Sequence, residues 1–246
     1  MKILADIGEY IMIIAQAFRR PDKGSVFRQQ LFFDLKQLGI SSIGVVFIIS
    51  IFFGTIIAIQ MAYNIDNPLV PKTTIGFGTR QMIVLEFAPT IISLILVGKV
   101  GSNIASEIGT MRVTEQIDAL KVMGINPANY LILPKITAAM LYNPVLIIFS
   151  MFLGLLGGWF AMLMTGLVSL DFYIEGLRSW YDPFTLTYAL IKTEVFAFII
   201  ASVSAYKGYT VKGGSIEVGK ASTDAVVICT ILIVFFDLVL TQMLLT

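Results

Sequence analysis

The sequence contains no histidine and only one cysteine, Cys229, among its 246 residues. Without histidine the chain cannot form a Ser-His catalytic pair, a His-ligated zinc site or the usual side-chain proton switch near neutral pH. A lone cysteine in an apolar run excludes a disulfide framework and a cysteine-ligated metal cluster. Charge is also scarce, because Asp, Glu, Lys and Arg make up 13% of the residues and the net charge is +1. We therefore predict no catalytic residue, no metal site and no nucleic-acid partner.

What the chain has in abundance is apolar sequence, since 57% of its residues are hydrophobic. This fraction is too high for a soluble domain of this length and is typical of a polytopic membrane protein. A membrane-spanning helix takes about 20 residues. The apolar stretches of that length predict an all-α fold with about five transmembrane helices, near residues 39–62, 81–100, 134–167, 184–206 and 224–244.

The third apolar run is ambiguous, because residues 136–170 carry no charge and Asn143-Pro144 could break the run into a hairpin. Cytoplasmic loops carry an excess of Lys and Arg. With five spans and a cytoplasmic N-terminus, thirteen of the seventeen Lys and Arg fall inside. Lys72, Arg80 and Arg178 fall outside, and Lys192 falls in the fourth span. A hairpin would move three inner lysines outward, so we predict one long helix and a periplasmic C-terminus. The thirteen are Lys2, Arg19, Arg20, Lys23, Arg28, Lys36, Lys99, Arg112, Lys121, Lys135, Lys207, Lys212 and Lys220.

Residues 1–38 are amphipathic. Their pattern does not match a signal peptide, because no small-residue cleavage site follows a compact apolar core. We predict interfacial helices on anionic lipid, preceding a single transmembrane permease domain at 39–246. The alternative is a soluble helix packed on a partner. The apolar positions are Ile3, Leu4, Ile7, Ile11, Ile14 and Phe18 before Arg19-Arg20-Pro21, and Phe27, Leu31, Leu35 and Leu38 after it.

A polar, charge-bearing segment at residues 98–127 separates two apolar runs. Thr114 is a candidate N-cap for a short helix, and Gly124 followed by Pro127 supplies its stop. The spacing of Ile117, Leu120 and Met123 predicts a small apolar ridge, surrounded by charges of both signs at Arg112, Glu115, Asp118 and Lys121. We expect a helix that docks on something outside the membrane; the alternative is a solvated loop helix with no partner.

The string from Glu107 to Leu120, EIGTMRVTEQIDAL, resembles the signature of the MlaE-type permeases. Those proteins are the membrane subunits of ABC systems that work with MCE-domain proteins to move phospholipids. The stretches 190–192 and 213–223 are similar to further family segments. The resemblance implies that residues 101–126 form a cytoplasmic coupling segment seated in a groove of the ATPase. The implied coupling residues are Glu107, Gly109, Arg112, Glu115, Gln116, Ile117 and Leu120.

The same resemblance implies the partners and the location of the protein. The partners are an ABC ATPase subunit, an MCE-domain substrate-binding protein, a second copy of the chain in a homodimer, phospholipid, and a small regulatory subunit on the ATPase. The location is the bacterial inner membrane. The segment Gly214–Ala221 nearly spells a phosphate-binding P-loop, but Ala221 replaces the Ser or Thr that holds magnesium, and no buried strand precedes it. We therefore expect no cofactor on this chain, with ATP and Mg²⁺ bound by the partner ATPase.

Charges inside the spans are costly and require a partner or a wet cavity. Glu86 lies near the outer end of the second span, in a segment similar to the family's Glu-x-Gly-Pro element, although Leu85 and Ala88 depart from that pattern. The predicted substrate pathway comprises Glu86 with Ile83, Phe87 and Pro89, because proline frees a backbone carbonyl and loosens the helix. The alternative is an anchoring ion pair between Glu86 and Arg80. We expect Lys192 to extend its amine outward and Glu194 to need a partner, and Asp237 lies near the outer end of the last span.

Small residues recur at Ser50, Gly54 and Ala58, and at Gly154 and Gly158, which allows close helix approach in a dimer or within one chain. The sequence thus predicts a homodimeric permease without catalytic activity of its own, which carries phospholipid between the membrane and an MCE-domain partner. The alternative is an ATPase-independent secondary transporter or channel that uses Glu86, Lys192 and Glu194 as an ion path. An intramembrane enzyme has no support, because no histidine dyad, metal cluster or paired-aspartate motif is present.

Overall fold

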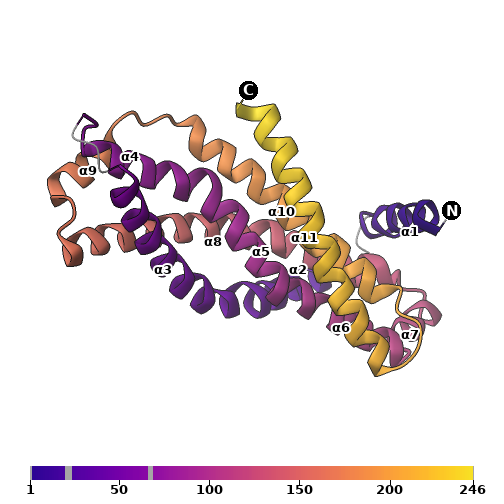
Figure 1. The fold of residues 1–246 in the computed structure, drawn as a ribbon. Helices are drawn as coiled ribbons and strands as arrows, with labels where there is room; N and C mark the ends of the chain where they lie inside the picture. The colour runs from indigo at the N-terminus through magenta and orange to yellow at the C-terminus, as the bar shows by residue number, and fades with distance from the viewer. Residues whose placement is uncertain (1, 20–23, 66–68, 246) are drawn as a thin grey trace. The chain divides into compact units, whose positions relative to one another are not determined.

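The computed structural model describes residues 2–19, 24–65 and 69–245, and it forms helices and no strands in these ranges (Figure 1). Three segments, labelled η, are π-helical turns, which are wider than α-helix. The elements are α1 Lys2–Ala17, α2 Gly24–Asp34, η1 Leu35–Ile40, α3 Ser41–Asn64, α4 Thr73–Met82, η2 Ile83–Ile91, α5 Ile92–Leu96, η3 Val97–Gly101, α6 Ser102–Val113, α7 Gln116–Val122, α8 Pro127–Thr165, α9 Leu170–Arg178, α10 Phe184–Tyr209 and α11 Ser215–Leu245.

Five helical runs in the described ranges are long and apolar enough to cross a membrane, which confirms the five predicted spans. The third is the single helix α8, which continues through Asn143 and Pro144, so the hairpin alternative is wrong. A proline in a membrane helix removes one backbone hydrogen bond, and neighbouring groups can compensate for it. The runs are Gly24–Asn64, Thr73–Val113, Pro127–Thr165, Phe184–Tyr209 and Ser215–Leu244.

The chain forms two compact units whose boundaries fall inside α3, α5, α8 and α10. Unit 1 comprises Met1–Ser42, Leu94–Asn143 and Glu194–Thr246, and unit 2 comprises Ile43–Ser93 and Pro144–Thr193. The domain boundary proposed from the sequence at residue 38 lies within η1, in the middle of the helical run Gly24–Asn64.

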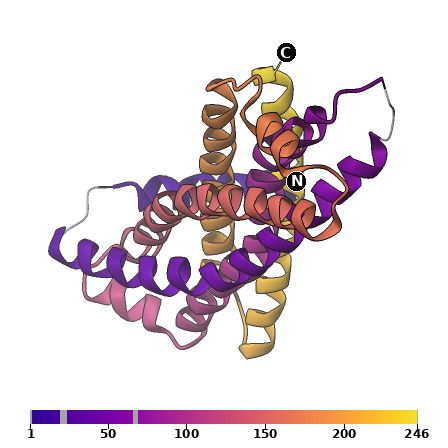
Figure 2. The same ribbon diagram turned by 90° about the vertical axis from the view of Figure 1, so that its left-hand side faces the viewer.

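In unit 2, α3 and α8 lie side by side with their backbones in close approach (Figure 2). A Cβ on Gly54 would stand 2.0 Å from the carbonyl oxygen of Gly154, and Ser50 donates a 2.8 Å hydrogen bond to Ser150. The predicted small-residue spacings therefore serve packing within one chain. Glycine is required at this crossing because any side chain would separate the two helices.

The other end of unit 2 joins α4 to α9 through Arg80. The buried guanidinium donates hydrogen bonds to the carbonyl oxygens of Leu177 at 2.6 Å and Trp180 at 3.1 Å, where α9 ends. Since the last carbonyls of a helix lack intrahelical donors, Arg80 acts as a C-terminal cap for α9.

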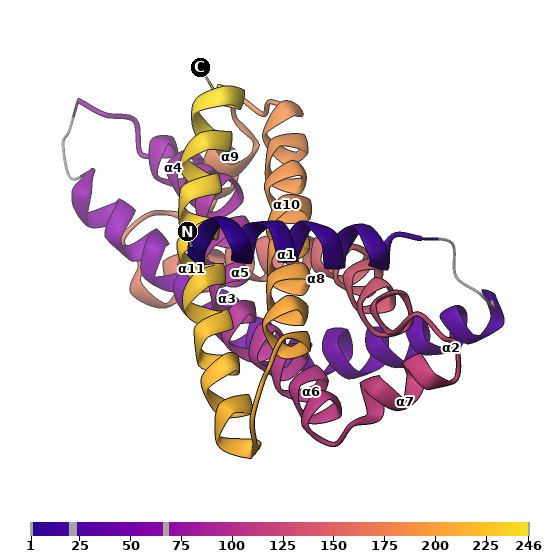
Figure 3. The same ribbon diagram turned by 90° about the vertical axis from the view of Figure 1, so that its right-hand side faces the viewer.

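In unit 1, α1 crosses α10 (Figure 3). The hydroxyl groups of Tyr10 and Ser202 lie 2.8 Å apart, and the rings of Phe18 and Phe198 are in contact. The helix predicted for this segment is confirmed, and most of its predicted apolar face is exposed. The exposed members are Leu4, Ile7, Ile11 and Phe18. Arg20, Pro21 and Lys23 lie outside the described residues, as do the side chains of Lys2 and Ile3.

The C-terminal end of α1 is held by the first turn of α8. Asn126 donates to the carbonyl oxygen of Gln16 at 3.1 Å, and Asn129 donates to that of Ala17 at 2.7 Å. The connection from α10 to α11 lies on the same side of unit 1, because Ser222 donates to the carbonyl oxygen of Ser102 at 3.2 Å. The N-terminal segment, the α6–α8 corner and the α10–α11 connection therefore share one end of unit 1, as the distribution of Lys and Arg predicts.

Candidate functional site

The first candidate site lies in unit 2, where the second span widens into the π-helical segment η2 around Pro89. Proline has no N–H, so Pro89 cannot donate the α-helical hydrogen bond to the carbonyl oxygen of Leu85, four residues earlier. Lys192 of α10 supplies a replacement, with its Nζ 3.4 Å from that oxygen. The prediction that Pro89 frees a backbone carbonyl is consistent with this contact.

Lys192 also forms an ion pair with Glu86, with Nζ 3.0 Å from Oε2. The side chain of Lys192 is fully buried, whereas that of Glu86 is 51% exposed. The Lys192 amine further lies 5.0 Å from the ring centroid of Tyr188. The expectation that Lys192 extends outward is therefore wrong, because the Glu86 carboxylate, the Leu85 carbonyl and the Tyr188 ring hold its amine at a buried position.

The Arg80 anchor for Glu86 is not the arrangement observed. Arg80 directs its guanidinium to the end of α9, and the ring of Phe77 lies 5.3 Å from it. Glu86 is on η2 and pairs with Lys192 instead.

Ile83 and Phe87 flank Glu86 in sequence but face the interior of unit 2. Ile83 is fully buried and packs against Gly154, since a Cβ added to Gly154 would lie 3.1 Å from the Ile83 side chain. Phe87 is buried and stacks on Phe53, with ring centroids 5.0 Å apart. Both support the wall behind Glu86, and their role in a substrate pathway stays a prediction.

Two other ionisable groups of the spans belong to unit 1. Glu194 is half-buried, and within the described residues its Oε2 atom is buried without a hydrogen-bond partner. Asp237 is half-buried near the end of α11. Glu194 and Lys192 stand two residues apart on α10 and face different directions, as expected for a helix.

The second candidate site is the predicted coupling segment 101–126, which forms α6, α7 and the turn into α8. The predicted N-cap at Thr114 is wrong, because α6 runs to Val113 and Thr114 terminates it by donating to the carbonyl oxygen of Thr110 at 2.8 Å. Glu115 precedes α7 in the left-handed conformation, with φ of 59°. For a non-glycine residue this conformation costs on the order of 1–2 kcal/mol, and such strain often occurs at functional turns.

The end of α7 follows the prediction. Gly124 adopts a φ of 74°, and its N–H donates to the carbonyl oxygen of Lys121 at 3.0 Å. Asn126 then caps α8 by accepting a 3.1 Å hydrogen bond from the N–H of Ala128, and Pro127 occupies the first position of the helix.

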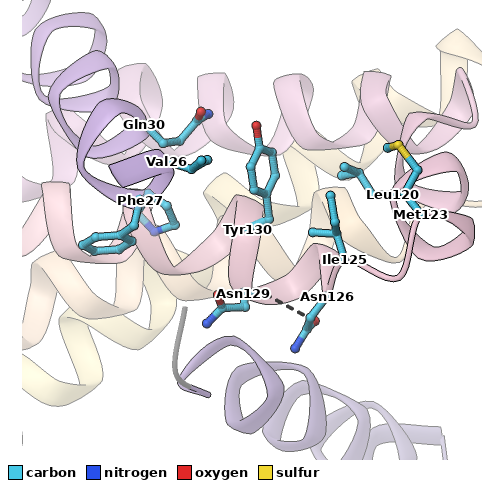
Figure 4. Close-up of a pocket in the computed structure, with 10 residues that line it drawn as sticks. Val26, Phe27, Gln30, Leu120, Met123, Ile125, Asn126, Asn129 and Tyr130 are labelled. Atoms are coloured by element: carbon cyan, nitrogen blue, oxygen red, sulfur yellow. Dashed lines mark hydrogen bonds between the residues drawn. The ribbon is translucent and has the colours of Figure 1, made fainter. Parts of the chain in front are cut away.

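The predicted apolar ridge of α7 does not point in one outward direction. Ile117 is fully buried, Leu120 is half-buried, and Met123 is exposed beside Val122, which is 89% exposed. Figure 4 shows Leu120 and Met123 on one side of a cavity of about 710 Å³, opposite Val26 and Phe27 of α2. Of the predicted ridge, only Met123 is exposed, and together with Val122 it forms the outward apolar surface of α7.

The outward charges of this corner form one cluster. Arg112 and Lys121 both donate to Oδ1 of Asp118, at 2.8 Å and 3.1 Å. The hydrogen bond from Lys121 is the largest cause that holds the pKa of Asp118 below its ordinary value, and the hydrogen bond from Arg112 acts in the same direction. Glu115 and Gln116 are exposed beside the cluster. The corner thus presents fixed charges of both signs on a short helix that stands outside the spans.

Glu107 and Gly109 of the family-like string face inward. Both carboxylate oxygens of Glu107 lie 2.9 Å from Nζ of Lys135, which also binds Asp34. A Cβ on Gly109 would stand 3.1 Å from Val218 of α11. The sequence did not identify Lys135 or Asp34 as site residues. The available signal was Lys135 itself, a charge immediately before the charge-free run 136–170.

The P-loop-like stretch lies at the start of helix α11 and follows helix α10. Residues 215–221 form the first turns of α11, and α10 ends at Tyr209. No strand precedes the glycines in this part of the structure, so the geometry that cradles phosphates in a P-loop is missing here.

Comparison with known proteins places these features in a wider group. The family model described as Permease MlaE matches residues 31–243. A probable ABC transporter permease protein of Rickettsia bellii is 35% identical over 228 residues, which cover 89% of this chain and 86% of that protein. A probable ABC transporter permease protein of Synechocystis sp. is 31% identical, covering 87% of this chain and 81% of its own length. The chloroplastic protein TRIGALACTOSYLDIACYLGLYCEROL 1 of Arabidopsis thaliana is 32% identical, covering 94% of this chain and 66% of its own length.

Proposed function

Because this chain belongs to the MlaE permease family, we propose that it is the membrane permease subunit of an ATP-driven phospholipid transport system. In this proposal the chain forms a homodimer in the inner membrane, with its N-terminus cytoplasmic and its C-terminus periplasmic. Lipid passes between the membrane and an MCE-domain partner. ATP and Mg²⁺ bind to a separate ATPase subunit, to which a small regulatory subunit can attach.

The observation that carries the proposal is the α6–α7–α8 corner. It bears a strained residue at Glu115, a fixed charge cluster around Asp118 and exposed apolar side chains at Val122 and Met123. A short, rigid, charged helix outside the spans is suited to receive force from a soluble partner. Relatives whose names describe probable ABC transporter permeases support an ATPase as that partner.

A lipid substrate is supported by the chemistry of η2. A lipid site is mostly apolar, with a few polar groups near the headgroup. The half-exposed carboxylate of Glu86, one helical turn from the exposed apolar side chain of Met82, fits that description, while Ile83 and Phe87 pack in the interior. One relative also carries the name of a glycolipid, trigalactosyldiacylglycerol.

The test is affinity purification of the tagged chain from membranes in mild detergent, followed by protein and lipid mass spectrometry. We expect an ATPase, an MCE-domain protein and phospholipid to co-purify. Val122→Asp and Glu115→Lys should remove the ATPase while membrane insertion persists, because a buried unpaired charge at an interface weakens binding by several kcal/mol. Leu69→Asp, at another exposed apolar residue, is the matched control and should retain the complex.

The competing function is a secondary transporter or channel. It is favoured by one observation, the buried carboxylate oxygen of Glu194 on the helix that carries Lys192. Transport by the purified chain alone in liposomes, driven by an ion gradient and without ATPase, would establish that function and refute ours.

A further inference from the structure

Lys135 of α8 joins three elements of unit 1 that are far apart in sequence. Its Nζ lies 2.9 Å from Oδ1 of Asp34, the last residue of α2, and 2.9 Å from both carboxylate oxygens of Glu107 on α6. An ammonium group has three N–H donors, and these three oxygens can accept all of them.

This cluster is not explained by stability alone. Lys135 and Asp34 are fully buried, and Glu107 is mostly buried. The loss of hydration offsets most of the attraction in such a cluster, and apolar side chains of similar volume often stabilise a fold as well or better. Two carboxylates also compete for one ammonium, and within the described residues Oδ2 of Asp34 has no hydrogen-bond partner. In some proteins a buried ion cluster instead fixes one defined placement of the elements that carry it.

The elements that this cluster holds together form the base of the corner that bears α7. Glu107 lies about midway along α6, and Lys135 lies two turns into α8, so their ion pair closes the base of the corner. Asp34 ties the helical run of the first span to that base. A second contact ties the first helical run to the second helical run, because Lys99 of η3 donates a hydrogen bond to the carbonyl oxygen of Ser41.

We infer that Lys135 is a positioning residue for energy coupling. This inference rests on the proposed docking of an ATPase at α7. The cluster makes α6, α8 and the start of the first span move as one body. A displacement of α7 is then transmitted to the spans, and the corner does not bend at its base. Glu107 acts through Lys135 and not by contact with the ATPase.

The test uses the complete reconstituted complex and measures ATP hydrolysis and lipid transfer in the same proteoliposomes. Lys135→Met should retain the ATPase but lower the lipid transferred per ATP at least tenfold. The triple variant Asp34→Asn, Glu107→Gln, Lys135→Met removes every charge and avoids an unpaired buried ion, so it remains a test if Lys135→Met does not fold. We expect the triple variant to be folded and still uncoupled. A wild-type ratio in either variant would show that the charges are only structural and would overturn the inference.

Two further measurements separate this inference from the proposed function. Lys36→Met removes an exposed lysine of η1, two residues from Asp34, and should leave the transfer ratio within about twofold of wild type, provided the ATPase binds. If no ATPase binds the wild-type chain, the proposed function fails, and spin-label distances between positions 25 on α2 and 119 on α7 still test the cluster. The distance distribution should broaden in the triple variant, and an unchanged distribution would refute the positioning role of Lys135.

Discussion

One missing backbone N–H, that of Pro89, shapes the surroundings of Glu86. The carbonyl oxygen of Leu85 accepts from Lys192, which is fully buried and also pairs with Glu86. Because these interactions bring the amine inward, the exposed carboxylate of Glu86 has a fixed cation behind it. A polar lipid headgroup at this position would meet a carboxylate whose orientation is already set.

At this residue scale, Glu86→Gln keeps the shape and removes the charge. We expect normal expression and ATPase binding, with lipid-stimulated ATP hydrolysis lowered about tenfold or more, since hydrogen bonds to charged groups contribute about 1.5–3 kcal/mol. Lipid should photocrosslink to a probe at the exposed position Met82, and less so in the variant. Absence of lipid at position 82 in the parent protein would exclude this face as the pathway.

Arg80→Gln is the matched control, because it removes a buried charge of the same span that caps α9. The loss of two hydrogen bonds to the Leu177 and Trp180 carbonyls should destabilise unit 2 by about 2–3 kcal/mol and lower the melting temperature. Crosslinking of lipid per folded molecule should not change. A loss of crosslinking in Arg80→Gln equal to that in Glu86→Gln would mean that both act through folding.

At the scale of elements, the contact between α3 and α8 depends on glycine. Gly54→Val would drive a side chain into the backbone of Gly154, and overpacking of this kind costs about 2 kcal/mol or more. Gly44→Val on the same helix is the control, because nothing lies within 4 Å of a Cβ at that position. The prediction is a lower melting temperature in detergent for Gly54→Val only. Equal melting temperatures for both variants would contradict the observed helix contact.

At the scale of the whole molecule, one end of unit 1 gathers the N-terminal segment, the α6–α8 corner and the α10–α11 connection. An even number of spans must separate these segments, which agrees with five spans and disagrees with a hairpin at α8. Most of the lysines and arginines fall in these segments, so the positive-inside tendency predicts that they are cytoplasmic.

Cysteine labelling tests that topology in a Cys229→Ala background. Single cysteines at the exposed positions Thr114 and Ser215 should react with an impermeant thiol reagent only after the inner face is opened. Cysteines at the exposed positions Leu69 and Asp182 should react in intact spheroplasts. Labelling of position 215 from outside, with position 114 protected, would refute the five-span topology.

The sequence by itself determined the spans and their arrangement along the chain. Length and apolarity are properties of continuous segments, and a bilayer imposes both. At residues 134–167 they left a hairpin at Pro144 open, and the distribution of Lys and Arg along the chain predicted the single helix that is observed. The stop at Gly124 was also local, because a positive φ follows from the residue type. The family-like string identified the corner at 101–126, although its helix starts one residue later than expected.

Only the tertiary structure decided which side chains meet. Glu86 pairs with Lys192 and Lys135 with Asp34 and Glu107, and the members of most of these pairs are about a hundred residues apart. Helical periodicity says which residues share a face but not which way the face points, so Ile117 was expected outside and is buried. Small-residue spacing likewise permits a dimer contact or an internal one, and the packing of α3 on α8 made it internal. These choices depend on how separate helices dock, which no local pattern of residues contains.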